Sequence, residues 1–106
     1  MNPTEQHYKL LNALEQNPHA SQRELAAELG ISLGKVNYCL KALIQVGWVK
    51  VGNFTHSNNK LGYLYLLTPK GIEEKSILTK HYLQRKMEEF EQLKQEIEQL
   101  QDQVEN

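Results

Sequence analysis

The sequence predicts a mainly α-helical fold of the α+β class, with a three-helix core, one β-hairpin and a long C-terminal helix. Apolar residues recur at helical spacing over residues 4–46. Two segments rich in Val, Tyr and Leu follow, at residues 48–51 and 61–67, with a polar stretch between them. Beyond Gly71 no glycine or proline interrupts the chain, which favours one continuous helix. A chain of 106 residues is long enough for one small domain with such an extension.

The first predicted helix covers residues 4–16. Tyr8, Leu11 and Leu14 share one face of it, and we expect that face to pack in the core. The helix ends at Asn17-Pro18, because a residue that precedes proline disfavours helical geometry.

Two short helices with only a brief turn between them come next. Ser21 and Glu24 form a capping box at the start of the first, and Gly30 supplies the left-handed residue that ends it. Ser32 caps the second, which covers residues 33–46, and Gly47 ends it. Two helices joined by so short a turn are typical of the helix-turn-helix motif, whose second helix lies in the major groove of DNA. The predicted buried face of this second helix consists of Val36, Cys39, Leu40 and Leu43.

A β-hairpin directly after a helix-turn-helix is a wing. We predict its strands at residues 48–51 and 61–67 and its polar loop at residues 52–60. Thr68 and Pro69 then begin the last helix, because threonine is a favoured N-cap and proline suits the first helical position. The chain therefore divides into a winged helix-turn-helix domain over residues 1–70 and a long helix over residues 71–106.

The second half of the long helix carries apolar residues at heptad positions a and d, a pattern typical of a coiled coil. Lys86 occupies one d position and weakens the pattern. Glu89 and Lys94 of two copies attract one another in a parallel pair, which is modestly favoured because such a surface contact contributes at most about 1 kcal/mol. The alternative is a solvent-exposed helix that frays and has no partner. We predict a homodimer joined by a coiled coil through Leu83, Phe90, Leu93, Ile97, Leu100 and Val104.

The net charge of −1 hides an uneven distribution of charged residues. Residues 1–70 contain seven basic and four acidic residues, a net charge of +3, whereas residues 71–106 contain five basic and nine acidic residues, a net charge of −4. No acidic residue lies between Glu28 and Glu73, and we call residues 29–72 the acid-free window. Lysines in such a window can displace counterions from DNA because no nearby carboxylate competes for them. The alternative is a solvent-exposed surface on which the lysines cluster by chance. The lysines of the window are Lys35, Lys41, Lys50, Lys60 and Lys70.

Candidate DNA contacts come from the two short helices and the wing. The first turns of the second short helix point into the groove in this motif, so Leu33, Gly34, Lys35, Asn37 and Tyr38 are the predicted base readers. Asparagine can pair bidentately with adenine, and lysine can donate to guanine. A glycine costs about 1 kcal/mol of helix propensity, so its presence here suggests a steric reason, such as a close approach of the backbone to DNA. Other polar and basic residues are expected to position the phosphate backbone. The complete predicted set is Ser21, Gln22, Arg23, Ser32, Leu33, Gly34, Lys35, Asn37, Tyr38, Lys41, Lys50, His56, Asn58, Asn59 and Lys60.

The order of these elements and the segment LTPKG at residues 67–71 resemble the MarR-type winged-helix transcriptional regulators. Within that family, the runs SQRELAAELGISLGKVNYCLKALIQVGWVKV and NKLGYLYLLTPKGIEEK are similar to the small MarR-like regulators associated with exopolysaccharide gene clusters. The resemblance covers residues 5–100 and implies a regulator of such genes. Typical members carry a wing-tip arginine that enters the minor groove, where this chain offers His56, Asn58, Asn59 and Lys60. Typical members also dimerise through helices from both ends, whereas here one C-terminal helix is predicted to join the copies.

The sequence holds no candidate catalytic, metal or cofactor site. The four histidines lack the spacing of metal ligands, and Cys39 lies on a predicted buried face, where a small hydrophobe is favoured over a redox-sensing thiol. A lone cysteine excludes an internal disulfide, and no apolar run approaches the roughly 18 residues of a membrane span. The N-terminus lacks the pattern of a signal peptide. We therefore expect a cytoplasmic protein that is not an enzyme and that binds neither a cofactor nor a membrane.

The predicted function is sequence-specific binding of double-stranded DNA by a homodimeric transcriptional regulator. It would act as a repressor that reads a palindromic operator through the helix at residues 33–46 and the wing at residues 52–60. The alternative is a protein–protein interaction module whose coiled-coil tail recruits a partner. Binding through lysines weakens steeply with salt and apolar binding does not, so salt dependence distinguishes the two. The operator, the target genes, the sign of regulation and any small-molecule effector remain open.

Overall fold

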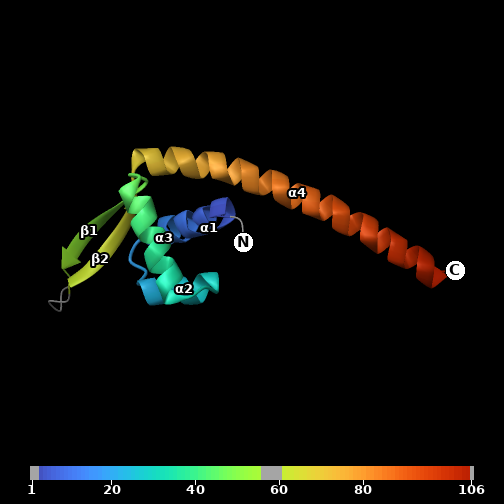
Figure 1. The fold of residues 1–106 in the computed structure, drawn as a ribbon, viewed down its shortest axis with the longest axis horizontal. Helices are drawn as coiled ribbons and strands as arrows, with labels where there is room; N and C mark the ends of the chain where they lie inside the picture. Colours follow the sequence, from blue (N-terminus) through green and yellow to red (C-terminus); the bar gives the residue numbers. More distant parts are fainter. Residues whose placement is uncertain (1–2, 56–60, 106) are drawn as a thin grey trace.

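The structure, a computed structural model, describes residues 3–55 and 61–105. Three short helices gather around a small core, a two-stranded hairpin extends from one side of them, and the fourth helix runs past the first and away from the rest (Figure 1). The elements in chain order are α1 (Pro3–Gln16), α2 (Gln22–Leu29), α3 (Leu33–Gln45), β1 (Val49–Thr55), β2 (Leu61–Leu67) and α4 (Pro69–Glu105).

The predicted mainly helical α+β fold is confirmed, and α1 and α3 each differ from their predicted bounds by a single residue. One prediction was wrong, because β1 continues to Thr55 and residues 52–55 are strand rather than loop. In the antiparallel register Gly52 pairs with Leu64 and Thr55 pairs with Leu61. Pairing with β2 keeps these residues extended although glycine and asparagine have low strand propensity. The remaining loop residues, 56–60, lie outside the described part of the chain.

The core lies where α1, α2, α3 and the base of the hairpin meet. Every residue of the predicted buried face of α3 is at most 5% exposed, so that prediction is confirmed. On α1, Leu11 and Leu14 are buried as predicted, whereas Tyr8 is half-buried at the contact with α4. The other buried apolar residues are Leu10, Ala13, Ala20, Leu25, Val49 and Tyr65.

The start of α4 is fastened to the end of α3 through Thr68. Its hydroxyl donates to the carbonyl oxygen of Gly47 (2.5 Å) and accepts from the backbone N–H of Gly71 (3.0 Å), so it caps α4 as predicted. The backbone N–H of Thr68 donates to the carbonyl oxygen of Trp48 (3.0 Å). A Cβ atom added to Gly71 would collide with the same Trp48 carbonyl. Residues 68–71 therefore hold α4 against the base of the hairpin at a distance that only glycine permits.

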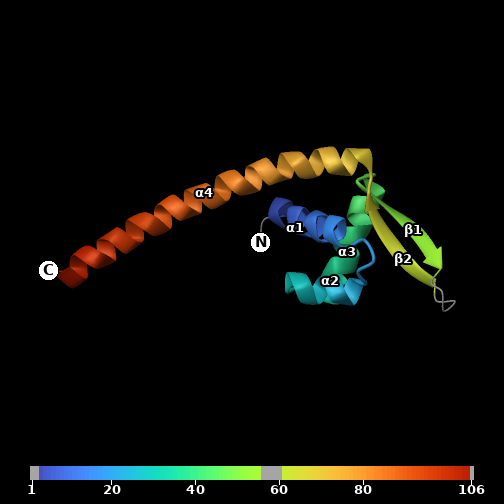
Figure 2. The same ribbon diagram turned by 180° about the vertical axis from the view of Figure 1, so that it is seen from behind.

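The first half of α4 runs alongside α1 (Figure 2). Lys75 forms an ion pair with Glu15 at 3.2 Å, and Arg85 forms one with Glu5 at 3.4 Å. Residues 86–105, by contrast, are exposed throughout. The contacts between the winged domain and α4 thus extend to Arg85, well past residue 70, where we drew the domain boundary from the sequence.

Aromatic and charged side chains mark the point where α4 leaves α1. Tyr8 of α1 stacks on Tyr82 of α4, with ring centroids 4.7 Å apart. Lys86 places its Nζ atom 5.3 Å from the centroid of the Tyr82 ring and donates to the Glu89 carboxylate at 3.1 Å. That hydrogen bond raises the pKa of Lys86 above its ordinary value. Lys86, the charged residue at a core position of the heptad pattern, therefore interacts with Tyr82 and Glu89 of the same helix.

Candidate nucleic-acid interface

The two helices of the helix-turn-helix begin at side-chain caps. The capping box of α2 is confirmed: Ser21 Oγ accepts from the backbone N–H of Glu24 (3.1 Å), and the Ser21 N–H donates to the Glu24 carboxylate (3.4 Å). Ser32 Oγ accepts from the backbone N–H of Lys35 (3.1 Å). Between the helices Gly30 has a φ of +68°, the left-handed conformation expected there. Ser21 and Ser32, both predicted DNA contacts, are thus exposed caps at the starts of α2 and α3.

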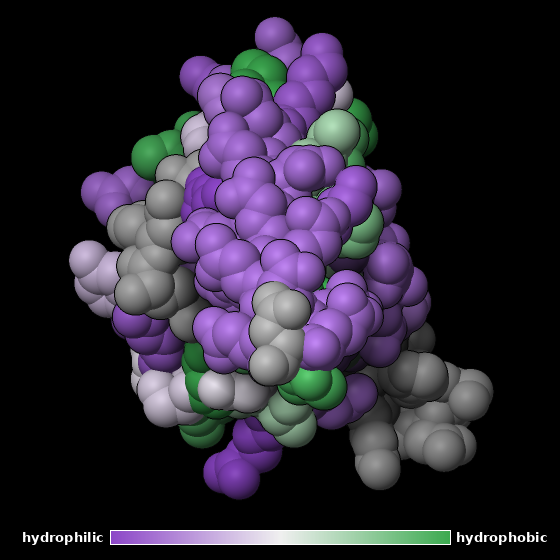
Figure 3. Space-filling model, turned by 90° about the vertical axis from the view of Figure 1, so that its right-hand side faces the viewer, coloured by the Kyte–Doolittle hydropathy of each residue, from purple (hydrophilic) through white to green (hydrophobic). Residues whose placement is uncertain are grey.

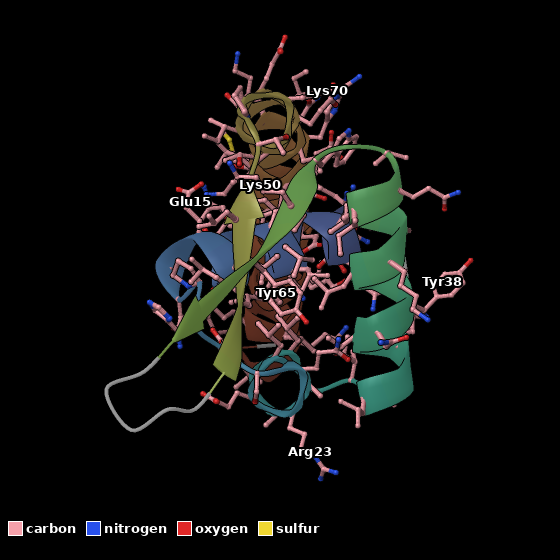
Figure 4. All side chains as sticks on the ribbon, turned by 90° about the vertical axis from the view of Figure 1, so that its left-hand side faces the viewer. Glu15, Arg23, Tyr38, Lys50, Tyr65 and Lys70 are labelled. Carbon is pink, nitrogen blue, oxygen red and sulfur yellow. The ribbon has the colours of Figure 1, made fainter. Side chains whose placement is uncertain are left out.

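The predicted base readers of α3 lie on its outer surface, except for Asn37, which is half-buried. Tyr38 is 75% exposed and points away from the rest of the domain (Figure 4). A Cβ atom added to Gly34 would meet no atom within 4 Å, so packing among the described residues gives no reason for glycine there. The exposed members of the predicted set on this helix are Leu33, Gly34, Lys35, Tyr38 and Lys41.

Asn37 belongs to a chain of hydrogen bonds that crosses three elements. Its Nδ2 donates to Oε1 of Gln22, the first residue of α2, at 3.2 Å. Gln22 in turn donates through Nε2 to the hydroxyl of Tyr65 on β2, also at 3.2 Å. Gln22 and Asn37 are half-buried and Tyr65 is 7% exposed. We call these three residues the Gln22 relay; it joins both helices of the motif to the wing.

The labelled side chains in Figure 4 divide the basic residues between two ends of the domain. Arg23 projects from α2 at the bottom of this view. The N-terminus of α3 and the far end of the hairpin point toward the same end of the domain. Lys50 and Lys70 lie at the opposite end, near the start of α4. Arg23 and Lys50, a predicted backbone contact, therefore lie toward opposite ends of the domain. The predicted wing-tip residues His56, Asn58, Asn59 and Lys60 lie outside the described residues.

The electrostatics of this surface are set by unopposed lysines. Lys35, Lys41, Lys50 and Lys70 are exposed, and within the described part of the chain none of them forms an ion pair. The ion pairs that the structure does contain lie on α1 and α4, outside the acid-free window. The positive charge of the window is therefore available to an anionic ligand.

Burial perturbs two titratable groups of the domain, Cys39 and His7. Burial raises the pKa of the Cys39 thiol above its ordinary value, against a smaller opposing effect of the charge on Lys35. Cys39 is 5% exposed, which confirms its prediction as a small core residue. Burial lowers the pKa of His7, whose ring meets Trp48 edge-on with centroids 6.4 Å apart. Neither group reaches the outer face of α3.

Sequence reasoning missed the Gln22 relay. Gln22 and Tyr65 are 43 residues apart in the chain, so no helical or strand periodicity relates them. Tyr65 is buried in the core, yet its hydroxyl accepts a hydrogen bond from Gln22. One feature of the sequence could have indicated it: Asn37 lies beside the apolar stripe of α3. At such a position a polar side chain meets a neighbouring helix and not open solvent.

The described residues contain neither a cluster of metal ligands nor a membrane-spanning helix. No three His, Cys, Asp or Glu side chains gather there as metal ligands would. No helix in the described ranges combines the length and apolar character that crossing a bilayer requires.

Residues 4–50 match the family described as winged helix-turn-helix DNA-binding. A comparison with curated protein sequences found no match. This family match ends at the start of β1, so it covers the three-helix part of the domain and not the long helix.

Solved structures extend the likeness to nearly the whole chain. A MarR/EmrR family transcriptional regulator from Acinetobacter sp. ADP1 is 20% identical, with a TM-score of 0.67 over 94% of this chain and 75% of that one. A mutant of MepR from Staphylococcus aureus bound to an oligodeoxyribonucleotide is 18% identical, with a TM-score of 0.60 over 98% of this chain and 79% of that one. The transcriptional regulator PcaV from Streptomyces coelicolor, in complex with its natural ligand, is 20% identical, with a TM-score of 0.61 over 74% of this chain.

This chain spans only 55% of the length of PcaV. The structural likeness to the Acinetobacter regulator and to the MepR mutant nonetheless covers 94% and 98% of this chain. The chain is therefore a winged helix-turn-helix protein with the fold of the MarR-family transcriptional regulators.

Proposed function

We propose that the protein is a cytoplasmic transcriptional regulator that binds double-stranded DNA sequence-specifically as a homodimer. In this proposal α3 enters the major groove, the wing supplies further contacts with the operator, and occupancy of a palindromic operator represses transcription. The resemblance to regulators associated with exopolysaccharide gene clusters suggests such genes as targets.

The observation that carries the proposal is the outer surface of α3. It presents Lys35, Tyr38 and Lys41 to solvent next to Gly34, where the backbone itself is uncovered. It also lies within the acid-free window, and its lysines form no ion pair with any described residue. A helix that combines cationic, aromatic and bare-backbone positions on one exposed face suits the major groove, which offers phosphates at its rims and base edges at its floor.

The second half of α4 supports the homodimer. The six predicted dimerisation residues are 46% to 86% exposed, although all are large and apolar. Figure 3 looks at the molecule from the free end of α4: hydrophilic side chains cover most of that helix, and apolar ones show at its margins. The 37 residues of α4 extend about 55 Å, and the radius of gyration of 18.5 Å exceeds the roughly 13 Å of a compact domain of this size. A second copy would bury this apolar stripe, most of which lies in the part of α4 beyond its contacts with α1.

Symmetry sets the expected operator. A twofold dimer presents its two α3 helices to one side of the duplex, so we expect inverted half-sites with centres about 10–11 base pairs apart. The parallel coiled coil proposed from Glu89 and Lys94 places both winged domains at the same end of the pair, as this spacing requires.

Selection from a randomised duplex library tests the proposal, followed by measurement of the salt dependence of binding to the enriched sequences. We expect an inverted repeat to be enriched. The double variant Lys35→Gln/Lys41→Gln should bind more weakly, with a salt slope reduced by about two if both lysines contact phosphates. Lys80→Gln, which neutralises an exposed lysine of α4, is the matched control and should bind as the wild type does. Protection of unrelated, non-palindromic sequences would count against a dimeric operator-binding regulator.

The exposed apolar stripe of α4 also favours a second candidate function, an interaction module that recruits another protein. In that case no sequence would be enriched, and binding of the protein partner would depend far less on salt.

A further inference from the structure

We propose that the Gln22 relay orients Asn37 to read an adenine, so that Gln22 and Tyr65 determine sequence specificity through Asn37. This inference rests on the proposed function, DNA binding through α3. It names the base that one residue of α3 recognises, and it assigns a positioning role to a wing-strand residue that is buried in the core.

The geometry gives Asn37 a defined orientation. Nδ2 of Asn37 donates to Oε1 of Gln22, and the opposite end of the Gln22 carboxamide donates to the Tyr65 hydroxyl, each at 3.2 Å. Tyr65 is itself held in place, because it is 7% exposed and its backbone N–H donates to the carbonyl oxygen of Pro18 at 3.2 Å. The relay therefore holds Gln22 with its oxygen toward Asn37 and Asn37 with its amino group toward Gln22.

The hydrogen-bonding capacity of Asn37 is only partly used. A carboxamide has two N–H donors and one carbonyl acceptor, and Gln22 takes one donor. The carbonyl oxygen Oδ1 has no hydrogen-bond partner among the described residues, and it is absent from the buried atoms that lack partners, so solvent reaches it. One N–H and the adjacent oxygen thus remain together on the edge of the amide that Gln22 leaves free.

That free edge matches adenine. In the major groove adenine presents an acceptor at N7 beside a donor at N6, and a carboxamide pairs with both at once. If the Gln22 carboxamide turned over, its amino group would face Asn37, and Asn37 would have to offer its oxygen to Gln22 instead. The adenine-reading edge would then lose its acceptor. The orientation of Gln22 therefore governs whether Asn37 offers both halves of the pair.

Base-pair substitution of the selected operator tests the proposal with the full-length protein. We expect one A·T pair in each half-site at which wild-type affinity falls about tenfold or more on substitution. Asn37→Ala should lose the preference at that pair alone. Gln22→Ala and Tyr65→Phe should weaken the preference at the same pair, although Tyr65 itself does not reach DNA. Tyr8→Phe, which removes a tyrosine hydroxyl on the other side of the domain, should leave the preference at every position unchanged.

A rescue variant separates orientation from general stability. Gln22→Glu keeps an oxygen facing the amino group of Asn37, and the Tyr65 hydroxyl can donate to its other oxygen. We expect Gln22→Glu to retain the adenine preference while overall affinity falls, because the variant adds a negative charge near DNA. Thermal unfolding of each variant corrects the affinities for the folded fraction.

The outcomes distinguish this inference from the proposed function. If the wild type enriches an operator but Asn37→Ala weakens all sequences equally, Asn37 is structural and the inference is overturned while the regulator stands. Equal base preferences in Gln22→Ala and the wild type would overturn the positioning role of Gln22. If the wild type enriches no sequence, both the proposed function and this inference fail.

Discussion

Two glycines of this chain occupy helical positions for opposite reasons. Gly34 lies near the start of α3 with open space where a side chain would be, whereas Gly71 lies near the start of α4 with the Trp48 carbonyl in that space. Glycine costs helix stability at both positions. Substituting alanine at each site therefore tests whether the glycine leaves room for a ligand, as we infer for Gly34, or is required by packing, as we infer for Gly71.

At Gly34 we expect alanine to stabilise the free protein by about 0.5–1 kcal/mol, because alanine has the higher helix propensity and meets no neighbour. The same change should weaken operator binding, since the new methyl group would stand between α3 and the DNA. Thermal unfolding and operator titration measure the two effects. Unchanged affinity in a stabilised Gly34→Ala protein would show that the backbone does not approach the DNA there.

At Gly71 we expect alanine to destabilise the protein by about 1–3 kcal/mol, because a well-packed contact must open to admit the added carbon. The backbone of Trp48 cannot move aside as the end of a long side chain can. Chemical denaturation measures the change, with Gly34→Ala as the matched control of opposite sign. An unfolding free energy equal to that of the wild type would contradict the close approach of α4 to the hairpin.

His7 gives the stability of the domain a pH dependence. Burial lowers its pKa in the folded protein below the ordinary value of 6.5, so protonation favours the unfolded chain. The stabilisation from neutral His7 is complete above pH 6.5 and is lost as the pH falls from there through the lowered pKa. We expect the melting temperature of His7→Gln to fall less than that of the wild type between pH 7.5 and 5.5. A ring titration of His7 by NMR with a midpoint above 6.5 would contradict the assignment.

At the scale of single elements, α4 carries two functions in succession. Its first half packs on α1 through two ion pairs and the Tyr8–Tyr82 stack, so its direction is fixed relative to α3. Its second half, residues 87–105, contains seven acidic residues and one lysine, a net charge of −6, beside its exposed apolar stripe. When two such segments pair in parallel, burial of the apolar stripe favours the dimer and repulsion between the acidic residues opposes it.

We expect Ile97→Glu to abolish or greatly weaken dimerisation, because the change places a charge inside the proposed coiled coil. Gln95→Glu adds the same charge at an exposed position off the apolar stripe and serves as the control. Sedimentation measures the dimer dissociation constant, which should rise about tenfold or more for Ile97→Glu. An unchanged constant would show that the second half of α4 does not join the copies.

Salt tests whether repulsion between the two acidic segments opposes the proposed dimer. Added salt screens the repulsion between two like-charged segments, so a parallel dimer should become tighter as ionic strength rises. Binding to DNA should weaken under the same conditions. A dimer that weakens with salt would contradict this expectation and show that attractive pairs such as Glu89 with Lys94 outweigh the repulsion.

For the whole molecule, the elongated shape couples dimerisation to DNA binding. The structure measures 68 × 28 × 23 Å, and α4 accounts for its length (Figure 1). Two winged domains joined through α4 bind their half-sites as one unit, so the second contact benefits from a high effective concentration. We expect Ile97→Glu to lower affinity for the full operator by about a hundredfold while affinity for an isolated half-site stays the same. Equal losses on both duplexes would mean that the substitution acts on the winged domain itself.

Most of the fold could be predicted because its signals are local. The cap at Ser21, the left-handed Gly30 and the apolar spacing of α3 each depend on residues within one or two helical turns. The extension of β1 to Thr55 could not be predicted, because Gly52 and Asn53 are poor strand formers until β2 pairs with them. For the same reason the candidate site was predicted as a set of separate residues and not as a network.

The sequence by itself determined the helix-turn-helix, the wing after it, the buried face of α3 and the separation of charge along the chain. The tertiary structure decided that Asn37 and Gln22 bond to one another and to Tyr65, that Lys50 lies apart from Arg23, and that α1 packs along the first half of α4. Caps and apolar periods act between neighbours in the chain and can be read from it directly. Contacts between residues tens of positions apart exist only after the elements have packed, and packing depends on every side chain in the core.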